Sequence, residues 1–252
     1  MKVVVTKDYE AMSRYAADLV QECVGRDPQS LVSFPGGDTP VGMLREFVSR
    51  VNSGAIDPTG LKFVQLDDWV GIGPRDEGSC SHFVNTQLIA PMHRPFADQF
   101  LFDGSNVDTI DQQLEEQDAF IRRYGPIAVE VLGIGMNGHL GFNENGVDFS
   151  LRSHRTPLSV VTKSVQKKYF GGRDLPLTEG ITQGIAQIME AELVILLANG
   201  ARKAEIVSKA ITGPVTNEVP ASILQKHPNC VWVLDREAAE LLPKDFPGME
   251  IQ

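Results

Sequence analysis

The chain of 252 residues alternates short apolar segments, rich in β-branched or aliphatic residues, with longer segments of helical periodicity. The apolar segments predict strands at residues 2–5, 31–34, 63–66, 129–132, 193–197 and 231–234. The intervening segments predict helices at residues 9–24, 41–51, 81–89, 107–124, 183–189 and 202–211. Apolar strands joined by helices are typical of a parallel sheet that helices cover on both faces. We therefore expect an α/β fold, in a single domain spanning residues 1–252, because no linker or low-complexity tract divides the chain.

The charge and the apolar pattern limit the partners of this chain. Its formal net charge of -10 argues against binding to nucleic acid or to an anionic membrane, because either would need clustered Lys and Arg. No segment has the pattern of an export signal or the length of a membrane span. Cys23, Cys80 and Cys230 are too scattered for a zinc site or a disulfide framework. We expect a cytoplasmic protein with a small-molecule ligand, and homo-oligomerisation stays open.

Ligands of parallel α/β sheets bind beyond the carboxyl ends of the strands, which directs attention to three strand ends. The first is followed by Gly36, Gly37, Asp38, Thr39 and Pro40. Glycines let the backbone approach an anion, and Thr39 and Pro40 suit the first turn of a helix whose dipole favours a phosphate. A tight turn would need the glycines equally. Asp38 is unfavourable beside a dianion unless its carboxylate points away.

At the second strand end, two carboxylates, Asp67 and Asp68, follow the apolar segment 63–66. Successive strand residues face opposite sides, so we expect one of the pair to enter the crevice. A partly desolvated carboxylate there is suited to take a proton from a carbon next to a carbonyl. The alternative interpretation is a helix cap or a surface turn.

The third strand end is a glycine-rich loop, residues 133–144, that contains Asn137, His139, Asn143 and Glu144. Its glycine spacing is not that of a GxGxxG nucleotide loop. The loop can bring His139 and Glu144 together, an arrangement suited to a proton-carrying imidazole oriented by a carboxylate. The remaining histidines are interpreted as packing or surface residues: His82, His93, His154 and His227.

Together with segments 200–204 and 219–228, these three loops resemble the family of glucosamine-6-phosphate deaminases. That family also includes galactosamine-6-phosphate deaminase/isomerases and shares its fold with 6-phosphogluconolactonases. The resemblance covers almost the whole chain. It implies a Rossmann-like parallel sheet with helices on both faces and a small lid over the site, here at about residues 150–178.

The resemblance also implies roles for individual residues. Asp67 would move a proton between C2 and C1 of the sugar, and His139, oriented by Glu144, would open the ring. A second set of residues would hold the phosphate of the sugar: Gly36, Gly37, Thr39, Lys203 and Lys168. Lys168 stands where relatives often have an arginine, and it keeps the charge but lacks the bidentate fork.

One position departs from the pattern of glucosamine-6-phosphate deaminases, because Asn137 occupies the place of an aspartate. Asparagine can accept a hydrogen bond and orient the ring of His139, but it supplies no negative charge to an imidazolium. The Asn-Gly-His order resembles the galactosamine-6-phosphate branch. The sequence thus favours galactosamine 6-phosphate over glucosamine 6-phosphate as the substrate.

The implied reaction turns an amino-sugar 6-phosphate into the ketose 6-phosphate and ammonia, and it needs no metal and no organic cofactor. Three alternatives remain at this level. A 6-phosphogluconolactonase would use the same phosphate loop, but residues 140–144 lack its Ser-Leu-Phe-Pro-like continuation. A non-catalytic sugar-phosphate binding protein and an isomerase that releases no ammonia are the other two.

Overall fold

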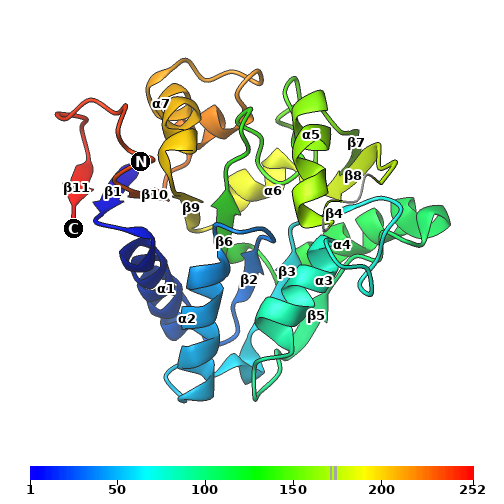
Figure 1. Ribbon diagram of the computed structural model, residues 1–252. Helices are drawn as coiled ribbons and strands as arrows, with labels where there is room; N and C mark the ends of the chain where they lie inside the picture. Colours follow the sequence, from blue (N-terminus) through cyan, green and yellow to red (C-terminus); the bar gives the residue numbers. More distant parts are fainter. Residues whose placement is uncertain (171, 173–174) are drawn as a thin grey trace.

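The computed structural model describes residues 1–170, 172 and 175–252, and the side chains of residues 165–168 lie outside this description. Its main element is an eight-stranded parallel sheet (Figure 1). In spatial order the strands are β11 (Met249–Ile251), β1 (Lys2–Thr6), β10 (Cys230–Asp235), β9 (Val194–Ala198), β6 (Ile127–Gly133), β2 (Leu31–Phe34), β3 (Lys62–Gln65) and β5 (Asp98–Phe100). The predicted α/β class and parallel sheet are confirmed.

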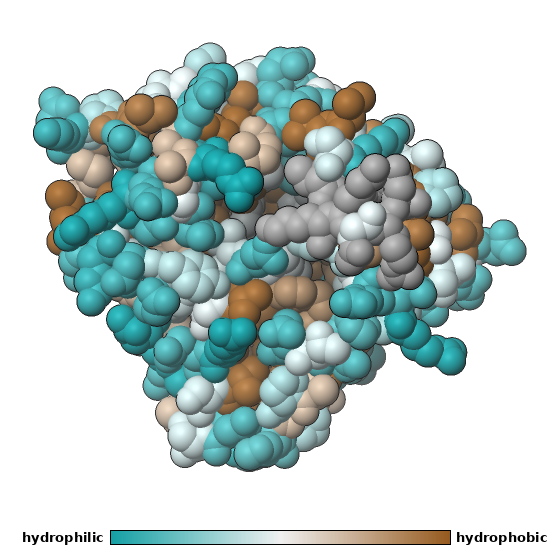
Figure 2. All heavy atoms as spheres, viewed as in Figure 1, coloured by the Kyte–Doolittle hydropathy of each residue, from teal (hydrophilic) through white to brown (hydrophobic). Residues whose placement is uncertain are grey.

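Helices cover both faces of the sheet because its strands are apolar on both sides. In β1, Val4 belongs to one hydrophobic cluster, while Val3 and Val5 belong to the other. The first face packs against α1 (Tyr9–Arg26), α2 (Val41–Asn52), α3 (Cys80–Val84) and the π-helix η2 (Asn85–Ile89). The second packs against α4 (Ile110–Tyr124), α6 (Ile185–Glu190), α7 (Ala204–Thr212) and the 3-10 helix η5 (Pro220–Lys226). The surface outside these layers is mostly hydrophilic on the face shown in Figure 2.

A second, three-stranded antiparallel sheet was not predicted. It consists of β4 (Asp67–Trp69), β8 (Glu179–Thr182) and β7 (His154–Pro157), and α5 (Val160–Tyr169) follows β7 (Figure 1). The predicted strand 63–66 ends at Gln65, and the chain then turns into β4. This turn is held by Gln65, whose Nε2 donates to the carbonyl of Asp67 at 2.7 Å. The expected lid segment, at about residues 150–178, thus contains β7, which is a strand of the second sheet, and α5.

The start of α2 differs from the prediction. Thr39 does not cap this helix, which begins after Pro40 without a side-chain cap. The hydroxyl of Thr39 instead donates to Asn199 Oδ1 at 2.9 Å. This bond links the loop after β2 to the loop after β9, on either side of β6. The hydroxyl of Tyr9 on α1 accepts from the N–H of Gly42 at 2.8 Å and so satisfies a donor of the first turn.

A glutamate, Glu130, lies in the centre of the main sheet and is 0% exposed. Its Oε2 accepts from Gln183 Nε2 at 2.9 Å, while Oε1 has no hydrogen-bond partner among the described residues. Burial raises the pKa of Glu130 to about 8, and the charge of Asp67 acts in the same direction. Glu130 is therefore expected to be protonated at neutral pH.

Replacing Glu130 with glutamine should remove the loss of folding stability that wild type suffers as pH rises. Because its folded pKa is above that of the unfolded chain, Glu130 contributes stability below pH 4.5 that is lost as pH rises through about 8. The unfolding free energy of Glu130→Gln minus that of wild type should increase by on the order of 2 kcal/mol as pH is raised from 5 to 8. Urea unfolding measures it, with the exposed Glu115→Gln as control. Equal pH dependence in Glu130→Gln and wild type would contradict this assignment.

Candidate active site

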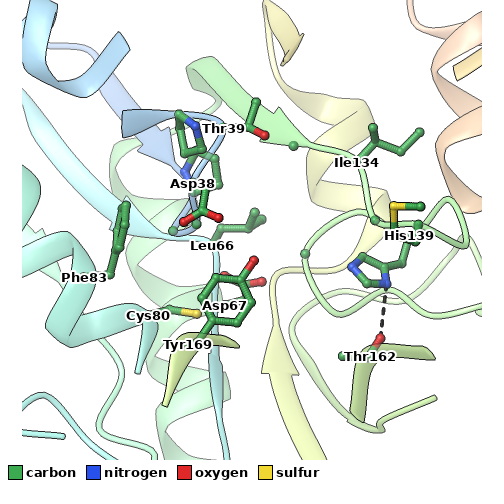
Figure 3. Close-up of a pocket in the computed structure, with 18 of the residues that line it drawn as sticks. Asp38, Thr39, Leu66, Asp67, Cys80, Phe83, Ile134, His139, Thr162 and Tyr169 are labelled. Carbon is green, nitrogen blue, oxygen red and sulfur yellow. Dashed lines mark hydrogen bonds between the residues drawn. The ribbon is translucent and has the colours of Figure 1, made fainter. Parts of the chain in front are cut away.

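A cavity of about 1070 Å³ opens at the carboxyl ends of β2, β6 and β9, as expected for this kind of sheet. Its walls come from the loops after these strands, from β4, from α3 and from α5. The residues predicted for the site and placed on these walls are Gly36, Gly37, Thr39, Asp67, His139 and Lys203. Segments far apart in the sequence therefore meet here, as Figure 3 shows.

The loop after β2 forms one wall of the cavity and contains the glycines predicted for the phosphate. Gly37 adopts a φ of 103°, which strongly favours glycine, and an added Cβ there would lie 3.9 Å from the hydroxyl of Tyr169. Lys203 brings an ammonium group to the cavity wall, where its Nζ donates to the carbonyl of Ile134 at 2.5 Å. Asp38 is exposed and also lines the cavity. The side chain of Lys168, the remaining predicted phosphate ligand, lies outside the described residues.

The two adjacent carboxylates on β4 separate as predicted. Asp68 is 0% exposed and faces the interior, whereas Asp67, which is 9% exposed, lines the cavity. Burial, and then the charge of Asp68, raise the pKa of Asp67 to about 7. A carboxylate with this pKa can exchange protons near neutral pH.

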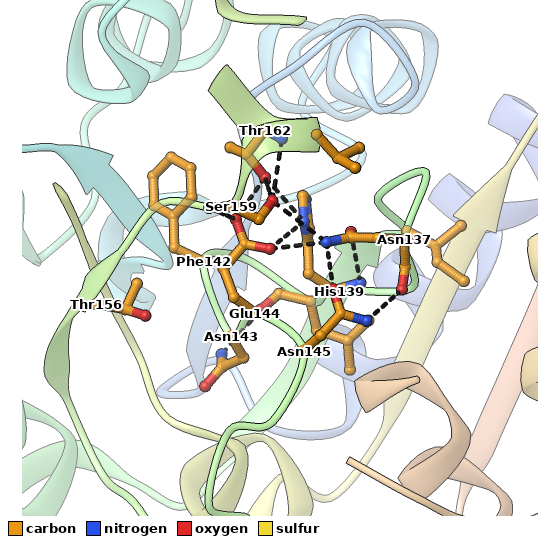
Figure 4. A network of polar contacts seen from close by, with 12 residues as sticks. Asn137, His139, Phe142, Asn143, Glu144, Asn145, Thr156, Ser159 and Thr162 are labelled. Carbon is orange, nitrogen blue, oxygen red and sulfur yellow. Dashed lines mark hydrogen bonds and ion pairs between the residues drawn. The ribbon is translucent and has the colours of Figure 1, made fainter. Parts of the chain in front are cut away.

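The loop after β6 brings His139 and Glu144 together, with Nδ1 and Oε2 3.4 Å apart (Figure 4). Glu144 is 6% exposed and also accepts hydrogen bonds from the Thr162 hydroxyl and, at 3.2 Å, from the N–H of Ser159. Burial by itself would raise the pKa of Glu144, but the hydrogen bond and charge of His139, with the bond from Thr162, lower it to about 2. Glu144 is thus a permanent negative charge behind the imidazole.

Asn137 acts on this pair through Glu144 and not through the ring of His139. Its Nδ2 donates to Glu144 Oε2 at 2.8 Å and to Asn145 Oδ1 at 2.5 Å. Its Oδ1 accepts from the backbone N–H of His139 at 3.4 Å. The expectation that Asn137 orients the ring directly is therefore corrected, because Glu144 and Thr162 are the groups that approach Nδ1.

Comparison with known proteins agrees with this architecture. Residues 7–232 match the model of the glucosamine-6-phosphate isomerases/6-phosphogluconolactonase family. The chain belongs to this family. A glucosamine-6-phosphate deaminase of Clostridium perfringens is 34% identical over 96% of this chain and 100% of its own length. One from Lachnoclostridium phytofermentans is 36% identical over 91% of this chain and 97% of its own length.

Solved structures of family members have the same fold. A monomeric glucosamine-6-phosphate deaminase superposes with a TM-score of 0.89 at 28% identity and covers 96% of this chain and 100% of its own. The 6-phosphogluconolactonase of Leishmania guyanensis has a TM-score of 0.76 at 16% identity, over 96% of this chain and 98% of its own, and this likeness concerns the fold alone. In the described part of the chain, no helix is both long and apolar enough to cross a membrane.

Several residues on the cavity wall were not identified from the sequence as site residues. Cys80 and His82 come from α3, and Thr162 and Tyr169 come from α5. His82, interpreted as packing or surface, is a lining residue whose Nδ1 lies 3.2 Å from the carbonyl of Pro74. Burial raises the pKa of Tyr169 to about 12, as do the nearby acidic groups. No sequence motif marks these residues. Their helices, α3 and α5, lie at the cavity because of how the second sheet packs, and local sequence does not encode this packing.

Replacing Glu144 with glutamine tests whether this side chain is ionised in the folded protein at neutral pH. Because the folded pKa of Glu144 is below its unfolded value of 4.5, its contribution to stability is present above pH 4.5 and is lost as pH falls through about 2. The variant should be less stable than wild type by on the order of 2 kcal/mol at pH 7, and the difference should shrink toward pH 2. Urea unfolding against pH measures it, with the exposed Glu240→Gln as control. A difference independent of pH would refute the ionic role.

Proposed function

We propose that this protein is an amino-sugar 6-phosphate deaminase that converts a 2-amino-2-deoxyhexose 6-phosphate and water into the ketose 6-phosphate and ammonia. The observation that carries the proposal is that two groups suited to proton transfer, Asp67 and His139, line one cavity (Figure 3), and that Glu144 lies 3.4 Å from the imidazole of His139. A glycine loop and a lysine suited to a phosphate line the same cavity. The names of the curated relatives support the same substrate class.

The phosphate would be anchored by the backbone of Gly36 and Gly37, the hydroxyl of Thr39 and the charge of Lys203, with Lys168 on α5 as a further ligand. Anchoring one end of the sugar fixes the reacting carbons against the walls of the cavity. Lys203 lines the cavity, and its Nζ donates to the carbonyl of Ile134.

His139 would open the sugar ring by moving the proton of the C1 hydroxyl to the ring oxygen as the bond between C1 and that oxygen breaks, and the negative charge of Glu144 stabilises the protonated imidazole in between. Asp67 as a carboxylate would then take the proton from C2 and return it to C1. The resulting imine at C2 adds water, and the carbinolamine expels ammonia to leave the ketone. A pKa of about 7 lets Asp67 both accept and donate this proton at neutral pH.

The configuration preferred at C4 is the finer part of the proposal. The relatives reported above are named glucosamine-6-phosphate deaminases, which supports glucosamine 6-phosphate. The Asn137-Gly138-His139 order predicts galactosamine 6-phosphate. We take glucosamine 6-phosphate as the first substrate to test, because its support comes from relatives that align over nearly the full chain.

Purified protein should release ammonia and a ketose 6-phosphate in equal amounts from one of the two hexosamine 6-phosphates. The assay compares glucosamine 6-phosphate with galactosamine 6-phosphate, and it includes 6-phosphogluconolactone to measure lactonase activity. A faster reaction with either sugar identifies the C4 preference. The deaminase proposal fails if neither sugar yields ammonia, and lactone hydrolysis alone would instead indicate the lactonase branch.

Asp67→Asn should lower kcat by about 10³-fold, because an amide cannot take the proton from C2. Binding of the ketose 6-phosphate, measured by calorimetry, should stay within about twofold of wild type, since Asp67 is not placed at the phosphate loop. Wild-type activity should also fall as pH drops below about 7, where Asp67 becomes protonated. The matched control is the exposed Asp108→Asn. Near-normal turnover by Asp67→Asn would remove it as the base.

A further inference from the structure

Thr162, in the first turn of α5, lies against the pair formed by Glu144 and His139 (Figure 4). Its side chain is almost fully buried and lines the cavity. The hydroxyl of Thr162 donates to Glu144 Oε1, and its Oγ1 lies 3.4 Å from His139 Nδ1, the contact drawn in Figure 3. A single hydroxyl group thus contacts both members of the pair.

The start of α5 fixes the position of this hydroxyl. Ser159 is the N-cap residue of the helix, and its Oγ accepts from the N–H of Thr162 at 3.1 Å. The N–H of Ser159 in turn donates to Glu144 Oε1 at 3.2 Å. Because the N-cap residue and the first turn of the same helix donate to one carboxylate oxygen, the start of α5 is joined to Glu144.

The directions of these hydrogen bonds follow from the charge of Glu144. Its pKa of about 2 keeps Glu144 ionised, so both of its oxygens can only accept. The one proton of the Thr162 hydroxyl therefore goes to Oε1, and Oγ1 keeps its lone pairs for other donors. Nδ1 of His139 then faces two acceptors, because Glu144 Oε2 and Thr162 Oγ1 each lie 3.4 Å from it. This arrangement favours the tautomer of the neutral imidazole that has its proton on Nδ1.

The imidazole of His139 is also fixed by a glycine of its own loop. A Cβ added to Gly135 would lie between 2.3 and 2.5 Å from three ring atoms, Nε2, Cδ2 and Cε1, so the ring packs directly on the backbone there. The N–H of Gly135 donates to the carbonyl of His139 at 3.0 Å. With Nδ1 turned toward Thr162 and Glu144, Nε2 is the nitrogen that a ligand in the cavity can reach (Figure 3).

We propose that Thr162 is a positioning residue for His139, because its hydroxyl keeps the imidazole proton on Nδ1 and so leaves the lone pair of Nε2 for the sugar. This inference rests on the proposed function, in which His139 opens the ring. Nε2 accepts the proton of the C1 hydroxyl and passes it to the ring oxygen, while Nδ1 keeps its own proton. Without the Thr162 hydroxyl, Nδ1 loses one of its two acceptors and Glu144 loses a donor.

The first test compares Thr162→Val with Thr162→Ser in the proposed deamination. Thr162→Val keeps the shape of the side chain and should lower kcat about tenfold, the effect of one hydrogen bond to a charged group. KM should stay within about twofold of wild type, because Thr162 is not assigned to the phosphate. Thr162→Ser should restore kcat, because it keeps the hydroxyl. The matched control is Thr212→Val on α7, where the lost hydroxyl donates to the carbonyl of Ser208 at 2.8 Å, away from the cavity. An unchanged kcat in folded Thr162→Val, or no rescue by serine, overturns the proposal.

The second test needs no turnover and so separates this inference from the proposed function. Nitrogen NMR of protein labelled at histidine locates the proton of the neutral imidazole at alkaline pH, and the His139→Gln variant identifies the signals of His139. Wild type should have this proton on Nδ1, and Thr162→Val should exchange it with water about tenfold faster. A proton on Nε2 in wild type, or an exchange rate that Thr162→Val leaves unchanged, would refute the inference even if ammonia is released. The expected signals without ammonia release would support the contact and count against the proposed reaction.

Discussion

The site depends on the buried carboxylate of Asp68. It accepts hydrogen bonds from the N–H groups of Trp69, Cys80 and Ser81 and, at 3.3 Å, from Gln65 Nε2. These bonds satisfy a charge that is fully buried, which would otherwise be costly. They also join β3, β4 and α3, so the chain can leave the main sheet and still present Asp67 to the cavity.

The buried acids in and beside the site differ greatly in strength. Asp67 and Glu130 lie where burial favours the neutral form, and the pKa of each is raised to about 7 and about 8. Glu144 is also buried, but His139, Thr162 and Asn137 donate to it, and its pKa is lowered to about 2. The lowered pKa of Glu144 thus follows from its hydrogen-bond donors and the charge of His139, whereas burial outweighs the other influences at Asp67 and Glu130.

Periodicity and strand ends predicted much of this arrangement. The six predicted strands are all present, the main sheet is parallel, and the segments that contain Gly36, Asp67 and His139 do meet at one edge. The reason is geometric, because the carboxyl ends of parallel strands lie on the same side of a sheet. The second sheet was missed because β4, β7 and β8 are short and separated by up to about a hundred residues, so no local pattern indicates their pairing.

The sequence by itself therefore determined the class of fold, the strand ends that meet at the cavity, and that one of Asp67 and Asp68 would face it, since all of these follow from local periodicity. Only the tertiary structure decided which side chains tune these groups. Cys80, Thr162 and Tyr169 carry no motif, and Thr39 bonds to Asn199 instead of capping its own helix. Such contacts depend on where α3 and α5 pack, and packing between distant segments leaves no periodic signal in the chain.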